Sequence, residues 1–83
     1  MQFGFAKTDI TPRIGVDLCG FGPFINRCSV GIRDRLWARA LAVSDGATTA
    51  VIVSCDLVGV ALSTTREVRE RVTASAGIPG DHV

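Results

Sequence analysis

One short segment limits the folds open to this chain more than any other: residues 50–57, AVIVSCDL, are apolar at almost every position. A strand that is apolar on both faces is typical of the centre of a sheet that other layers cover on both sides. The preceding segment, LWARALAVS, alternates large side chains with alanines, as a strand with two different faces does. Asp45-Gly46, between the two segments, is a strong hairpin signal. The sequence therefore predicts a β-hairpin over residues 36–57.

A second strand is predicted near the start of the chain. FGFAKTDI, residues 3–10, places Phe3, Phe5 and Lys7 on one side and smaller residues on the other. Residues 11–34 follow, with two prolines, four glycines and no sustained period. An irregular segment of this length is uncommon in a compact domain unless it is functional or packs against further polypeptide.

One helix is predicted, in STTREVRERVTASAG at residues 63–77. Thr64 and Glu67 have the spacing of a capping box, and Gly77 followed by Pro79 supplies a stop. An apolar residue recurs every fourth position on one face: Val68, Val72 and Ala76. The charged residues between them predict a solvated face, so the helix is expected to lie on a sheet by a narrow stripe.

The residues after this helix, GIPGDHV, predict the start of another strand. A helix that ends at Gly-x-Pro, a short loop and a β-branched residue is how a crossover reaches the next parallel strand. The predicted fold class is therefore α/β with a mixed sheet: strand, long loop, hairpin, and a helix crossing to a parallel strand that is cut off at Val83. We expect residues 1–83 to be an incomplete, N-terminal part of a larger α/β domain.

Composition excludes several classes of function. An apolar content of 47% is that of a folded protein, and a formal charge of +1 gives no electrostatic case for nucleic acid or an anionic membrane. No apolar run approaches the ~20 residues that span a bilayer. The N-terminal segment MQFGFAKTDI lacks the pattern of a secretion signal, which favours a cytoplasmic location.

The cysteines and the single histidine do not predict a metal site within this chain. Cys19, Cys28 and Cys55 have no C-x-x-C spacing, and we expect buried reduced thiols. A Cys19–Cys28 disulfide in an oxidising compartment remains an alternative. His82 has no cysteine near it in sequence and is expected to be an exposed loop or strand-edge residue, because a lone imidazole cannot hold zinc.

Five segments follow one another at a characteristic spacing: GFAKTDITP, LCGFG, GIRDRLWARALAVSDG, AVIVSCDLVGV and REVRERVTASAGIPGDHV. Their order resembles the start of the neutral/alkaline, non-lysosomal ceramidases and their bacterial relatives, over about residues 3–83. The resemblance implies a zinc-dependent amidohydrolase that cleaves the N-acyl amide of a ceramide-like lipid into fatty acid and sphingoid base. Many of these relatives are secreted.

Zinc is the implied cofactor, since it polarises an amide carbonyl and lowers the pKa of a bound water. In the family, the first ligands form a His-x-His pair at the end of the strand that Val83 is expected to begin. The ligands are therefore expected beyond residue 83, and the chain alone is expected to be inactive. The implied partners are the lipid amide and the rest of the catalytic domain.

Two residues are candidates for substrate binding by this resemblance, Gly20 and Phe21. Gly20 aligns with a glycine whose backbone lies beside the substrate amide in relatives, and a glycine permits close approach to a ligand. Phe21 and Phe24 would be natural walls for an acyl or sphingoid chain. Alternatively, Gly20 serves a turn with positive φ, and the two phenylalanines are core residues.

Asp56 interrupts the apolar run and needs a partner, because an unpaired buried charge is costly. It is a candidate for orienting a ligand histidine from the next strand. Alternatively, its carboxylate accepts hydrogen bonds from the turn at residues 57–59 or pairs with Arg39 across the hairpin. Arg39 itself is expected to pair with Asp56 or Asp9. Asp9 is expected to cap a turn before Pro12.

A different class of function stays open beside the hydrolase. The chain could be a small α/β module that binds a partner or completes an oligomer by strand addition at an unpaired edge. The long irregular segment and the two-sided apolar strand argue against a self-sufficient module.

Overall fold

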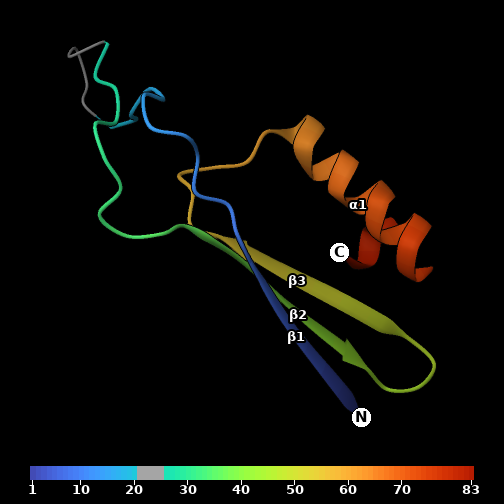
Figure 1. Cartoon of the computed structure of the whole chain (residues 1–83). Helices are drawn as coiled ribbons and strands as arrows, with labels where there is room; N and C mark the ends of the chain where they lie inside the picture. Colours follow the sequence, from blue (N-terminus) through green and yellow to red (C-terminus); the bar gives the residue numbers. More distant parts are fainter. Residues whose placement is uncertain (21–25) are drawn as a thin grey trace.

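The computed structural model describes residues 1–20 and 26–83. It contains three strands, a helix and a short 3-10 helix, arranged as in Figure 1. Their bounds are β1 Gln2–Asp9, β2 Trp37–Ser44, β3 Thr49–Cys55, α1 Leu62–Ala76 and η1 Gly80–His82. The chain is thus a small mixed α/β structure.

The three strands form one antiparallel sheet in the order β1-β2-β3. Both the strand near the N-terminus and the hairpin were predicted, and both are confirmed. At the hairpin turn, the Asp45 carboxylate accepts hydrogen bonds from the backbone N–H groups of Ala47 (2.9 Å) and Thr48 (2.7 Å). These bonds lower the pKa of Asp45. Gly46 has φ 93, a conformation that favours glycine.

The central position expected for β3 is not seen among the described residues. Within the described residues, β2 is central and β3 lies at the edge, because β1 pairs with β2 across a separation of about 27 residues of chain. Ile52 is accordingly 67% exposed. The Asp56 N–H donates to the Trp37 carbonyl at 3.0 Å. This bond shows which alternate residues of β3 form hydrogen bonds with β2. Residues 49, 51, 53 and 55 therefore direct their backbone groups away from β2.

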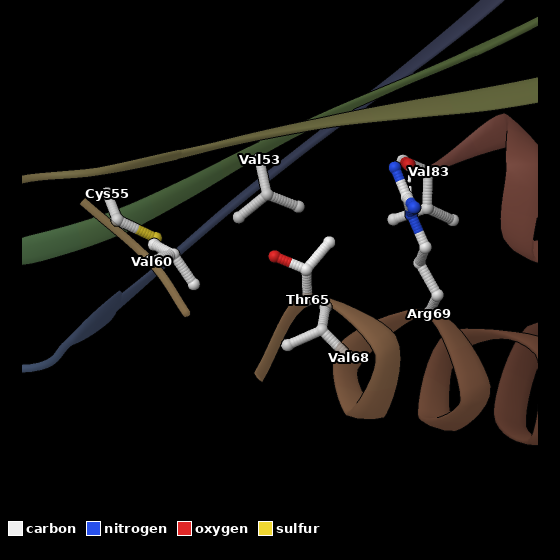
Figure 2. A pocket seen from close by; sticks show the side chains of 7 residues that line it. All are labelled: Val53, Cys55, Val60, Thr65, Val68, Arg69 and Val83. Atoms are coloured by element: carbon white, nitrogen blue, oxygen red, sulfur yellow. Dashed lines mark hydrogen bonds between the residues drawn. The ribbon is translucent and has the colours of Figure 1, made fainter. Parts of the chain in front are cut away.

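Alternation along the strands gives the sheet two different faces, because residues opposite one another in the register share a face. The first, called here the aromatic face, carries Phe3, Phe5, Lys7, Asp9, Trp37, Arg39, Leu41, Val43, Ala50, Ile52 and Ser54. The second, called the alanine face, carries Gly4, Ala6, Thr8, Ala38, Ala40, Ala42, Thr49, Val51, Val53 and Cys55. α1 lies beside β3 (Figure 1), on the side of the alanine face that carries Val53 and Cys55 (Figure 2).

The helix ends where the sequence predicts but begins earlier. Its N-cap is Ala61, which makes no side-chain capping hydrogen bond, so the predicted capping box at Thr64 and Glu67 is wrong. Both residues lie inside the first turns, and Glu67 instead pairs with Arg71 at 2.7 Å. Gly77 is the C-cap, with φ 69 and its N–H bonded to the Thr73 carbonyl at 2.9 Å.

The residues after α1 form the 3-10 helix η1, held between α1 and β3. The Arg69 Nε donates to the Val83 carbonyl at 3.0 Å. The Thr73 hydroxyl donates to the Ile78 carbonyl at 2.6 Å. His82 Nδ1 lies 3.1 Å from the Thr49 carbonyl at the outer edge of β3, which agrees with the strand-edge position expected for this histidine. No parallel strand is formed among the described residues.

The segment between β1 and β2, predicted to be irregular, contains a short ladder of its own. Leu18 N–H donates to the Arg27 carbonyl (2.8 Å), and Ser29 N–H donates to the Val16 carbonyl (2.9 Å). At its base, Ile10 N–H donates to the Leu36 carbonyl at 2.9 Å. The described residues of this segment extend away from the sheet (Figure 1).

No described residue is buried, so this part of the chain has no hydrophobic core. The accessible surface is 6635 Å², whereas a compact protein of 8.8 kDa exposes about 4,800 Å². The radius of gyration is 16.1 Å, against about 12 Å for a compact chain of this length. No described helix has the length and apolar character needed to cross a membrane.

Candidate functional site

The side chain of Asp56 continues the hairpin ladder past the end of β3. Its Oδ2 accepts a hydrogen bond from the Trp37 N–H at 2.9 Å, while its own N–H donates to the Trp37 carbonyl. The Nη1 of Arg39 lies 3.5 Å from the same Asp56 oxygen. The predicted pairing of Asp56 with Arg39 is therefore confirmed. The carboxylate receives its backbone hydrogen bond from β2, and not from the turn at residues 57–59.

This ion pair is exposed and weak by itself. The side chain of Arg39 is 55% exposed and that of Asp56 is 42% exposed, so Asp56 is not the buried charge that the sequence suggested. An exposed pair of this kind contributes about 0–1 kcal/mol. The hydrogen bond to the Trp37 N–H gives Asp56 its clearest structural role, because it fixes the start of β2 beside the end of β3.

At the end of β1, Asp9 accepts a backbone hydrogen bond, as Asp56 does after β3. Its carboxylate accepts from the Thr11 N–H at 2.8 Å, which confirms the predicted turn before Pro12. Hydrogen bonding to Thr11 holds the pKa of Asp9 below its ordinary value, with a smaller contribution from Arg35 at 3.7 Å. Arg39 is therefore paired with Asp56, and Asp9 takes a different arginine.

Together these groups form a charged end of the sheet, where β1 and β3 finish and β2 begins. It consists of Lys7, Asp9, Arg35, Trp37, Arg39 and Asp56. Lys7 Nζ lies 4.6 Å from the centre of the Trp37 ring, a cation–π contact. Sequence reasoning missed the roles of Lys7, Arg35 and Trp37. The pairing register that joins them depends on β1 meeting β2, which local sequence does not encode.

An open apolar cleft lies between β3 and α1 (Figure 2), with a volume of about 330 Å³. It is lined by Val53, Cys55, Val60, Thr65, Val68, Arg69 and Val83. Val53 and Val68 approach it from opposite sides, and Arg69 lies at one end beside Val83 (Figure 2). Its lining has no carboxylate or imidazole, so the cleft is suited to hold apolar side chains. Sequence reasoning did not predict it, because it depends on where α1 returns to the sheet.

Gly20, predicted to bind substrate, is exposed and has φ 93. A Cβ added there would meet nothing within 4 Å among the described atoms. The positive φ agrees with the alternative that this glycine serves a turn. Phe21 and Phe24 lie outside the described residues.

The cysteines differ from expectation, since none of the three is buried. Cys19 and Cys28 are exposed, Cys55 is half-buried, and all three are free thiols. The Cys28 thiol donates to the Asp17 carboxylate at 3.3 Å, which raises the pKa of Cys28. The described residues contain no group of three side chains suited to hold a metal ion.

Comparison of the chain with models of known protein families, with curated proteins and with solved structures finds no match.

Proposed function

We propose that the chain is the N-terminal part of the catalytic domain of a zinc-dependent amidohydrolase resembling neutral ceramidase. Its substrate would be a ceramide-like lipid amide, cleaved to fatty acid and sphingoid base. Two lines support the proposal: the five segments that occur in the order of that family, and a sheet that is uncovered on both faces. The order of the segments carries the proposed family and its chemistry, and the uncovered sheet supports only the proposal that the described part belongs to a larger domain.

The chain as a whole exposes more surface than a compact protein does, and part of this excess belongs to the long segment between β1 and β2. The accessible surface exceeds that of a compact protein of the same mass by about 1,800 Å². A standard protein interface buries only about 800 Å² on each partner. Further polypeptide that covers this excess would give the chain the core it lacks.

The outer edge of β3 is the place where that polypeptide would begin to pack. Backbone groups of Val51, Val53 and Cys55 point away from β2, and the apolar cleft runs alongside them. A parallel strand added there would pair with these groups and bury its side chains against Val60 and Val68. It would also bring its carboxyl end to the same edge of the sheet as Asp56.

The described residues do not form a zinc site, so the proposal assigns the ligands to the added polypeptide. Zinc in such a site supplies a polarised amide carbonyl and an activated water. The proposed role of Asp56 is to position a ligand side chain, because its carboxylate is 42% exposed and retains accepting capacity beyond Trp37 and Arg39.

The direct test uses the product of the complete open reading frame that contains these residues. We expect it to contain about one zinc per chain and to release fatty acid from an N-acyl sphingosine, with loss of activity on chelation. The 83-residue chain is the matched control and should do neither. A product without zinc that leaves N-acyl sphingosine intact would contradict the proposal.

The exposed edge of β3 also favours a second candidate, a small module that associates by strand addition. This candidate predicts that the 83-residue chain is monodisperse and unfolds cooperatively without further polypeptide. The amidohydrolase proposal predicts the opposite behaviour.

A further inference from the structure

We propose that Asp45 is a site of spontaneous backbone isomerisation to isoaspartate, and that the hydrogen bonds of the hairpin turn suppress this reaction in the folded protein. The turn joins β2 to β3. The inference is independent of the proposed amidohydrolase activity. It is argued from the sequence of the turn, its exposure and the hydrogen bonds that hold both reacting groups.

The reaction needs only water and groups that the turn already contains. The backbone nitrogen of Gly46 attacks the side-chain Cγ of Asp45, a C–N bond forms, and the Cγ–O bond breaks as water leaves. Water then adds back and opens the five-membered imide at either carbonyl. Opening at the former backbone carbonyl of Asp45 leaves isoaspartate, in which the main chain continues through Cγ. Nothing is oxidised or reduced, and the water that leaves is balanced by the water that returns.

Asp45 is the only aspartate in the chain that a glycine follows. The other aspartates precede isoleucine, leucine, arginine or histidine, whose side chains hinder access to the attacking nitrogen, and the single asparagine, Asn26, precedes an arginine. Glycine has no Cβ and leaves that nitrogen open to its neighbour. Residues 45–48 are all exposed, so water reaches both reacting groups. Sequence and exposure together select Asp45.

Two hydrogen bonds hold the carboxyl group of Asp45 in its unreactive form. Its Oδ1 accepts from the Thr48 N–H at 2.7 Å and from the Ala47 N–H at 2.9 Å. These bonds hold the pKa of Asp45 below its ordinary value, so the group is ionised at neutral pH. An ionised carboxylate resists attack, because its oxygen leaves as water only after it has been protonated. The same two bonds that close the turn therefore oppose the reaction.

The attacking nitrogen is engaged as well. The Gly46 N–H donates to the Ser44 Oγ at 3.2 Å, and the nitrogen becomes a nucleophile only when this proton is lost. The Asp45 N–H donates to the Thr48 carbonyl at 3.2 Å and closes the turn from the other side. Gly46 is fixed at φ 93. We therefore expect isomerisation to require local opening of the turn.

Isomerisation should weaken the hairpin. In isoaspartate the former side-chain carbonyl belongs to the main chain, so the acceptor for the Ala47 and Thr48 N–H groups is lost and the turn gains a backbone atom. Because loop length fixes the register of a hairpin, the pairing of Ser44 with Thr49 should loosen. Once separated from the parent protein, the isomerised form should have a lower Tm.

The test compares the complete gene product in native buffer and in urea, at the same pH and temperature. Peptide mapping by mass spectrometry measures isoaspartate at each aspartate over time. We expect it at Asp45 alone, forming at least about tenfold more slowly in native buffer than in urea, because the reaction follows opening of the turn. Equal rates in the two conditions would overturn the proposal, as would equal isomerisation of the other aspartates.

Ser44→Ala separates the hydrogen bonds of the turn from the stability of the whole protein. It removes the acceptor of the Gly46 N–H, so isomerisation in native buffer should be several-fold faster and the rate in urea unchanged. Ser54→Ala, at an exposed serine of β3, is the matched control and should change neither rate. Asp45→Glu should give no product at this position, because the ring would be larger. An unchanged native rate in Ser44→Ala, or the same increase in Ser54→Ala, would contradict the protective role of the turn.

Discussion

At the scale of single residues, three aspartates explain how the strands begin and end. Asp45 closes the hairpin turn, Asp9 closes the turn after β1, and Asp56 joins the end of β3 to the start of β2. Each uses a carboxylate oxygen as an acceptor for backbone N–H groups that have no partner in the ladder. The residue that raised the question of a buried charge is therefore an exposed one that completes a sheet.

Replacement of Asp56 tests this role. Asp56→Ala removes the acceptor for the Trp37 N–H and should lower the free energy of unfolding of the complete gene product by about 1 kcal/mol. Asp56→Asn keeps an acceptor oxygen and should cost less. Urea unfolding followed by Trp37 fluorescence measures both. If the two substitutions cost the same, the hydrogen bond to Trp37 is not what Asp56 contributes.

Acid should weaken the turns through the same carboxylates. Asp9 and Asp45 have pKa values lowered from 3.8 by hydrogen bonds, so each contributes stability that is fully present above pH 3.8. That contribution is lost as the pH falls through the lower value of the folded state. Unfolding of the complete gene product measured across this range should show less pH dependence in Asp45→Asn. An unchanged pH profile for that variant would show that the turn does not depend on the ionised carboxylate.

At the scale of elements, local sequence signals predicted the strands and the end of the helix. They did not predict features that depend on contacts between segments far apart in the sequence. Asp45-Gly46 predicted the hairpin because turn and register are local. Gly77 predicted the end of α1 because a positive φ is a property of one residue. The helix start was misplaced, because Ala61 is an N-cap without a capping side chain. The pairing of β1 with β2 and the cleft beside α1 arise from contacts that no single segment encodes.

The uncapped start of α1 predicts that one substitution there should stabilise the protein. Ala61→Asp would supply an acceptor for the free N–H groups of the first turn and a favourable charge at the helix N-terminus. We expect the variant to raise the free energy of unfolding of the complete gene product by about 1 kcal/mol. Ala74→Asp, on the same helix but away from its start, is the matched control and should not stabilise. Loss of stability in Ala61→Asp would mean that the helix does not begin at Leu62.

At the scale of the whole molecule, the central feature is a sheet without a core. The described residues include none that is buried, and apolar side chains lie exposed on both sides of the sheet. Composition predicts a folded protein, and the two-sided apolar character of β3 predicts that it is covered. Under the catalytic-domain proposal, further polypeptide packed at the β3 edge and on the aromatic face would meet both expectations. For the candidate site, the sequence predicted a partner for Asp56, and Asp56 has one. The proposed zinc ligands were expected beyond residue 83.

The most direct test of this account is urea unfolding of the isolated 83-residue chain, followed by Trp37 fluorescence and near-UV circular dichroism together. We expect no shared cooperative transition and little near-UV signal, because side chains without a core have no fixed packing. A single coincident transition, with a slope of about 1 kcal/mol per molar urea, would show that the chain folds by itself. That result would contradict the catalytic-domain proposal and favour the self-sufficient binding module.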